Sequence, residues 1–204
     1  MSFELLDNLL QVAALGGSAL TAGAFALRCR SRRCLTLALA YACFSMGTLY
    51  FVLHLAILGA TPLIFYVAEL SWLASYLFHL SFQILRTQGM KPGFQRLPAA
   101  CGLCAAAAIL CLRIFGPSYF VSALFALTAG ALAYLSAFRL RSGAKGRGID
   151  ALLLVCLCLQ VALYVVSGFT DSYDRFNLYF AVDMLLTLCL MGLLPLTVRE
   201  VRAQ

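Results

Sequence analysis

Five polar or aromatic residues interrupt an apolar stretch that runs from Pro62 to Arg86. They are separated by three, four, three and four positions: Glu69, Trp72, Tyr76, His79 and Gln83. On a helix these spacings place all five within a stripe about 100° wide, which is the width of one helix face. A carboxyl, an imidazole and an amide are costly to expose to lipid, so we expect this face to line a bundle interior or a watery cavity.

The opposite face of the same stretch is apolar and suits lipid or apolar neighbours. It comprises Leu63, Val67, Leu70, Leu77 and Ile84. We therefore expect the rest of the chain to wrap around the polar face.

A second carboxyl group, Asp183, lies at a matching position in a later apolar run. Asp183 follows Asn177 by six residues and Glu69 follows Pro62 by seven, so each carboxyl is expected about 10 Å below its helix end. No lysine or arginine is expected inside any span. Two such carboxyl groups need a proton, a histidine cation or a cationic ligand as a partner.

These residues predict a site for an amine or another organic cation. Carboxylates would supply the charge, and aromatic rings would supply cation–π contacts. We assign ligand binding to Glu69, Asp183, His54, Tyr50, Tyr66, Trp72, Tyr76 and Tyr179, and signal relay to His79 and Gln83. The alternative is structural: buried carboxyl and imidazole groups can bond to neighbouring helices and hold the bundle together.

The composition is that of an integral membrane protein. Of the 204 residues, 63% are hydrophobic and only 11% are charged, with a mean hydropathy of +0.94, whereas a soluble domain averages roughly 25% charged. A span needs about 20 apolar residues, so seven spans would use the whole chain as a single all-α transmembrane domain, residues 1–204. The predicted spans are 5–27, 35–58, 62–86, 97–115, 118–140, 149–169 and 178–198.

The basic residues predict the orientation of these spans. Thirteen of the fifteen fall in loops on one side, and only Arg113 and Arg175 fall on the other. This asymmetry places the amino terminus outside and the carboxyl terminus in the cytoplasm of a multi-pass protein in the cell membrane, in contact with the lipid bilayer. The net charge of +7 therefore reports topology, and we expect no nucleic-acid partner.

The nine cysteines are expected to act as small apolar residues. Seven fall in predicted spans, and Cys29 and Cys34 fall in the first basic loop, where cytoplasmic thiols stay reduced. Together with Cys101 and Cys104 they offer a four-thiolate zinc site as an alternative. The sequence lacks a paired-histidine helix motif, a serine elbow and a phosphate-binding glycine loop. We therefore expect no metal, no cofactor and no enzyme activity.

The run from Pro62 to Arg86, in which Glu69 precedes Trp72-Leu-Ala-Ser-Tyr-Leu77, resembles a known central span. It is similar to that of the seven-helix sensory regions that precede histidine kinase or diguanylate cyclase domains in bacteria. The resemblance implies a sensor of the bacterial inner membrane that binds a small molecule on its outer side. Because this sequence ends at Gln204 without an output domain, relay to a separate cytoplasmic signalling partner is expected.

A small solute carrier is the alternative function. The segments 65–70 (FYVAEL) and 178–183 (LYFAVD) are alike and place an acid at one depth in the third and seventh spans. This spacing fits two parallel three-helix repeats joined by the fourth span. That plan is similar to small sugar and vitamin transporters.

Overall fold

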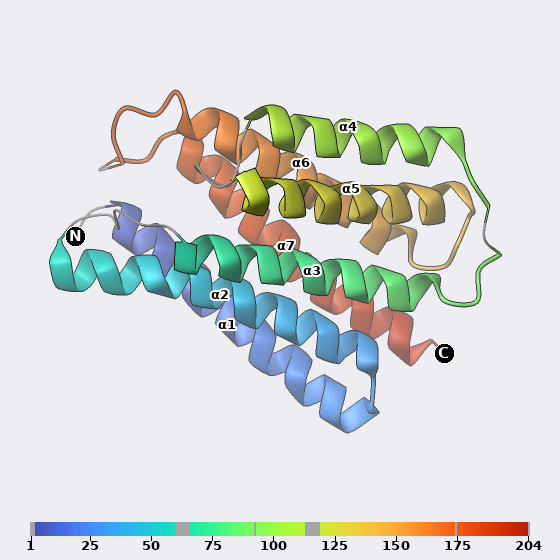
Figure 1. The fold of residues 1–204 in the computed structure, drawn as a ribbon. Helices are drawn as coiled ribbons and strands as arrows, with labels where there is room; N and C mark the ends of the chain where they lie inside the picture. The colour runs from blue at the N-terminus through green and yellow to red at the C-terminus, as the bar shows by residue number, and fades with distance from the viewer. Residues whose placement is uncertain (1–2, 60–65, 92, 113–118, 174, 204) are drawn as a thin grey trace.

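Seven α-helices make up the described part of the chain, which in this computed structural model comprises residues 3–59, 66–91, 93–112, 119–173 and 175–203 (Figure 1). They are α1 (Phe3–Cys29), α2 (Arg32–Leu58), α3 (Tyr66–Thr87), α4 (Arg96–Leu112), α5 (Tyr119–Arg141), α6 (Arg147–Ser167) and α7 (Leu178–Arg202). No strand occurs in these residues, so the all-α prediction is confirmed. Pro62, Leu63, Arg113 and the predicted span end 113–115 lie outside the described residues.

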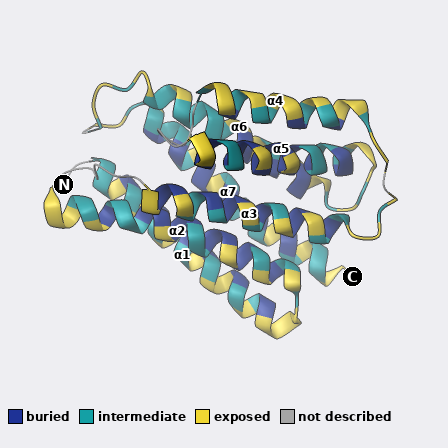
Figure 2. Cartoon of the chain, viewed as in Figure 1, coloured by how far each residue is buried: buried dark blue, intermediate teal, exposed yellow. Residues whose placement is uncertain are grey.

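Of the described helices, α1, α2, α5, α6 and α7 are long and apolar enough to cross a membrane. The helix α4 is apolar but has only 17 residues, and α3 carries the polar face. Large apolar side chains are exposed, for example Leu20, Leu127 and Leu188. Exposed positions recur along the helices of the bundle (Figure 2). The chain therefore has the character of a helical membrane protein, whereas seven spans and their orientation stay predictions.

The connection between α1 and α2 is shorter than predicted. The helix α1 continues to Cys29 and α2 begins at Arg32, so Cys34 lies within a helix. Ser31 caps α2, since its Oγ accepts a hydrogen bond from the Cys34 backbone N–H at 3.4 Å. The predicted placement of Cys29 and Cys34 in a basic loop is therefore wrong.

The helices form two groups of three that meet edge to edge. The helices α1, α2 and α3 pack in chain order, as do α5, α6 and α7. The groups meet where α3 packs against α5 and where α7 packs against α1 and α2, while α4 packs on α5 and α6 (Figure 1). The helices α4 and α5 cross closely, because a Cβ on Gly102 would lie 2.7 Å from the Gly130 carbonyl oxygen.

The polar face of α3 points into the bundle, as its spacing predicts. Glu69, Tyr76, His79 and Gln83 are buried, and Trp72 is half-buried. The described residues of the opposite face are exposed: Val67, Leu70, Leu77 and Ile84. The helix therefore divides into a face for the protein interior and a face suited to lipid. We call the two ends of the bundle the Glu69 end and the Arg86 end.

Candidate functional site

Asp183 lies in a buried polar cluster between α1, α2 and α7. Its Oδ1 accepts a hydrogen bond from Gln11 Nε2 at 3.0 Å, and the same nitrogen donates to Thr187 Oγ1 at 2.9 Å. Thr48 Oγ1 donates to Gln11 Oε1 at 2.6 Å. The Asp7 carboxyl group lies within hydrogen-bonding reach of Asp183. We call these five residues the carboxyl cluster, in which one amide joins three helices.

Aromatic rings cover the carboxyl cluster at the Glu69 end. The Tyr173 and Tyr179 ring centroids are 5.1 Å apart, and the Phe3 ring packs edge-on against Phe180 at 4.7 Å. Burial, followed by the nearby Glu4 carboxylate, raises the pKa of the Tyr173 phenol, which lies in the loop before α7. Acids and aromatic rings thus gather at one end of the bundle, a combination that suits an organic cation.

Trp72 packs between α3 and α2 near Glu69. Its ring stacks on Phe51 with a centroid distance of 5.6 Å and an angle of 21°. A Cβ on Gly47 would lie 2.8 Å from the indole Nε1, so only glycine leaves room for this ring. Glu69 is 6% exposed, and its Oε2 has no hydrogen-bond partner among the described residues.

The other predicted residues are spread along the interior and the Glu69 end. The Tyr50 and His54 rings lie 5.9 Å apart on α2, and Tyr66 is 48% exposed at the start of α3. Tyr76 lies deeper, where its hydroxyl donates to Gln160 Oε1 of α6 at 3.0 Å. These four residues come from two helices, α2 and α3.

The two predicted carboxyl groups lie at matching positions along their helices, counted from a shared contact. Arg86 of α3 contacts Glu200 of α7, with Nη2 and Oε2 2.8 Å apart. Glu69 and Asp183 each lie 17 residues before these partners, which is about 26 Å of helix. Among the described residues, however, the α3 and α7 backbones do not approach within 8 Å, and the Asp183 side chain bonds to Gln11 of α1. A cavity shared by both carboxyl groups stays a prediction.

The predicted relay residues connect α3 with α5 and α6. His79 is 1% exposed, and its Nδ1 lies 3.0 Å from the Ser75 carbonyl oxygen. Gln83 Nε2 donates to Asp150 Oδ1 at 2.6 Å and to Ser136 Oγ at 3.2 Å. Gln83 therefore leads directly into a second polar cluster at the Arg86 end.

This second cluster joins five helices through charged side chains. Arg86 Nη1 lies 2.5 Å from Asp150 Oδ1, and Arg139 Nε donates to the same oxygen at 3.1 Å. Glu200 accepts from Arg86 and, at 3.2 Å, from Arg33 Nη1. We call Arg33, Arg86, Arg139, Asp150 and Glu200 the ion cluster; it ties together α2, α3, α5, α6 and α7.

Some of the basic residues do more than indicate topology, because they are buried members of the ion cluster. Arg86 and Arg139 lie in the last turns of α3 and α5 and are buried, so the expectation of spans without arginine is wrong at their ends. The sequence held one signal for this. Arg86 follows Gln83 by three residues and so continues the stripe of polar residues on α3.

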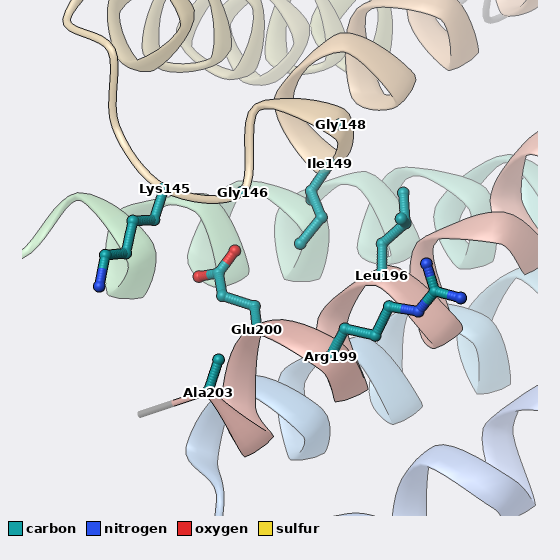
Figure 3. A pocket seen from close by; sticks show the side chains of 8 residues that line it. All are labelled: Lys145, Gly146, Gly148, Ile149, Leu196, Arg199, Glu200 and Ala203. Carbon is teal, nitrogen blue, oxygen red and sulfur yellow. The ribbon is translucent and has the colours of Figure 1, made fainter.

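A pocket of about 290 Å³ lies beside the ion cluster (Figure 3). Its lining residues are Lys145, Gly146, Gly148, Ile149, Leu196, Arg199, Glu200 and Ala203. The Glu200 carboxylate points at Gly146, where a Cβ would collide with Oε2, and Gly146 has a φ of +81°. Glycine is therefore required here for both space and backbone conformation. A second pocket, of about 500 Å³, lies at the other end beside the loop between α6 and α7.

The chain matches no protein family, no curated protein and no solved structure. Within the described residues, no group of three or more His, Cys, Asp or Glu side chains could hold a metal ion, and all nine cysteines are free thiols. Function is therefore inferred from the two polar clusters and the α3 face between them.

Proposed function

We propose that this protein is a seven-span membrane sensor that binds a small organic cation near its outer surface and signals to a cytoplasmic partner. The proposal assigns the Glu69 end to the outside, because the basic residues concentrate at the Arg86 end. The carboxyl cluster and its aromatic cover would receive the ligand. The ion cluster would pass the change to the cytoplasmic side.

The observation that supports this proposal best is that α7 is bonded through a carboxylate near each end. Asp183 bonds to Gln11 near one end, and Glu200 bonds to Arg33 and Arg86 near the other. Pro195 lies between them and lacks the backbone N–H that a regular helix would use. A ligand that draws Asp183 away from Gln11 would move α7 as a unit and shift Glu200 within the ion cluster.

The carboxyl cluster favours a cation as the ligand. Two carboxyl groups can bond to each other only when one of them holds a proton. A cationic ligand that enters beside Asp7 and Asp183 while that proton stays would neutralise the single negative charge of the pair. Tyr173 and Tyr179 would offer their ring faces to the same charge.

Thermal stability of the purified protein against a panel of amines, nucleosides and sugars tests the proposal. A compound at a hundred times its dissociation constant should stabilise the fold by about 2.7 kcal/mol. Asp183→Asn, which removes an acid of the carboxyl cluster, should abolish that rise. Asp171→Asn, which removes an exposed acid at the same end, is the matched control and should keep it. If no compound stabilises the wild type, the binding proposal fails.

The relay has its own readout at the Arg86 end. Cys34 is buried next to Arg33, so its alkylation rate reports opening of the ion cluster. A stabilising compound should change that rate in the wild type and leave it unchanged in Asp183→Asn. A compound that binds without altering Cys34 would separate binding from signalling.

A solute carrier is the second candidate, and the arrangement of the helices favours it. The contact of α3 with α5 corresponds to the contact of α7 with α1 when α1–α3 is superimposed in chain order on α5–α7. This correspondence is expected of two parallel repeats, and the ion cluster would then act as the inner gate. Flux of the stabilising compound into liposomes would favour the carrier; binding without flux would favour the sensor.

A further inference from the structure

One stretch of α3 concentrates the buried polar atoms that have no partner. Among the described residues six such side-chain atoms occur, and four of them fall between positions 69 and 79 of this helix. They are Glu69 Oε2, Trp72 Nε1, Ser75 Oγ and His79 Nε2. Buried polar groups in folded proteins bond to protein or to ordered water, so these four indicate bound water.

The spacing of these four residues matches a single file of water molecules. They follow one another by three, three and four positions, which places neighbouring Cβ atoms about 5–6 Å apart on one helix face. One water molecule with two hydrogen bonds of about 2.8 Å spans the same distance. The spacing of the side chains is therefore compatible with one bridging water between each pair of neighbours.

The chemistry of three of these groups allows a proton to pass along the file. His79 Nδ1 faces the Ser75 carbonyl oxygen, which only accepts, so Nδ1 carries the hydrogen and Nε2 presents a free lone pair. The Ser75 hydroxyl and the Glu69 carboxyl group can each donate and accept. Trp72 Nε1–H only donates and would hold a water in place.

The ion cluster closes the file beyond His79. Both parts of the Gln83 amide are occupied, since Nε2 donates to Asp150 and Ser136 and Oε1 accepts from Arg86 Nη1 at 2.7 Å. An amide held in this way offers no lone pair to an incoming proton. The file therefore has Glu69 at one end and His79 at the other.

We propose that bound waters along α3 carry a proton from the Glu69 end of the bundle to His79 Nε2. The Glu69 carboxyl group gives up its O–H proton to the first water, each water and the Ser75 hydroxyl pass one proton on, and an N–H bond forms at Nε2. The Glu69 carboxylate then takes a proton from the aqueous phase at its end. This step does not depend on ligand binding at the carboxyl cluster.

Protonation of His79 would change the electrostatic energy of the ion cluster. Tyr76 on its own helix and Tyr41 of α2 lie beside the imidazole, and Cys156 of α6 lies near both tyrosines. The charged groups at the Arg86 end are those of the ion cluster: Arg33 of α2, Arg86 of α3, Arg139 of α5, Asp150 of α6 and Glu200 of α7. Asp183 of α7 lies towards the other end. A cation at His79 adds to a cluster in which arginines already outnumber acids, so the proton should loosen it.

A pH step on the intact protein in lipid nanodiscs tests this proposal. The chain has two histidines, so in a His54→Gln background His79 is the one imidazole left. Infrared bands of isotope-labelled histidine then report the conversion to imidazolium after a step from about pH 7.5 to about pH 3.5, an end point low enough to protonate a buried imidazole. We expect His79 to gain a proton, and Glu69→Gln and Ser75→Ala to slow that gain about 100-fold.

Ser81→Ala is the matched control, because Ser81 lies on the exposed face of α3 and bonds only to the Leu77 carbonyl oxygen. It should leave the rate unchanged. If Ser75→Ala does not fold, Trp72→Phe takes its place as the test variant. It removes the indole N–H, keeps an aromatic ring and should slow protonation of His79. The proposal is overturned if His79 gains no proton, or if the variants of the file and Ser81→Ala have the same rate.

Discussion

Arg86 Nη1 and Asp150 Oδ1 lie 2.5 Å apart, and both side chains are fully buried. Arg86 lies in the last turn of α3 and Asp150 in the first turn of α6, so each charge also lies at the favourable end of a helix dipole. Asp150 is the shared acceptor of Arg86, Arg139 and Gln83. The pair therefore holds three helices together at one point.

Removal of the Asp150 charge should be strongly destabilising. Asp150→Asn leaves two buried guanidinium groups without this anion, which costs about 3–5 kcal/mol for a buried pair. The free energy of unfolding, measured with denaturant in detergent, checks this. Asp171→Asn at an exposed position should change it by less than about 0.5 kcal/mol. Equal effects of the two changes would contradict the assignment of the ion cluster.

Gly146 should tolerate alanine less well than Gly143, although both have positive φ values of +81° and +66°. Alanine at Gly143 meets nothing within 4 Å and should cost about 1 kcal/mol of backbone strain. Alanine at Gly146 also meets Glu200 and should cost more. Glu200→Ala should relieve part of that excess in a double-mutant cycle, because the Arg86 guanidinium also lies against this position, and an additive cycle would contradict the contact.

Gly47→Ala should displace Trp72, the only tryptophan of the chain. The added Cβ would lie 2.8 Å from Nε1, so the ring must leave its stack on Phe51. Tryptophan emission should therefore change in wavelength or intensity. Gly23→Ala, which meets nothing within 4 Å on another helix, should leave the emission unchanged and stabilise its helix by up to about 1 kcal/mol.

Gln11→Met should weaken the carboxyl cluster without a large change in volume. Asp183 and Thr48 would each lose the partner that Gln11 provides, at a cost of about 1–3 kcal/mol for each buried group left unpaired. Thermal midpoints compared with the wild type measure this. A control is Asn8→Ala, which removes a bond to the backbone oxygen of Glu4 in the same helix. A midpoint like that of Asn8→Ala would show that Gln11 does not join the helices.

The sequence by itself determined the helical class, the apolar segments and the polar face of α3. These depend on residues that are close in the chain, because a period of 3.6 residues fixes which side chains share a face. The expectation of a shared depth for Glu69 and Asp183 comes from the same kind of counting along two helices, and it stays a prediction. The same counting would have extended the polar face to Arg86.

Only the tertiary structure decided which partner each of these polar groups meets. Asp183 bonds to Gln11, 172 positions away, and Arg86 bonds to Glu200, 114 positions away. Such pairs leave no periodic trace, since they depend on how separate helices pack. An arginine near a span end looks the same in sequence whether it faces water or a buried acid. Helix packing places Asp150 and Glu200 against Arg86. An arginine that the sequence presents as a signal of topology is therefore a buried member of the ion cluster.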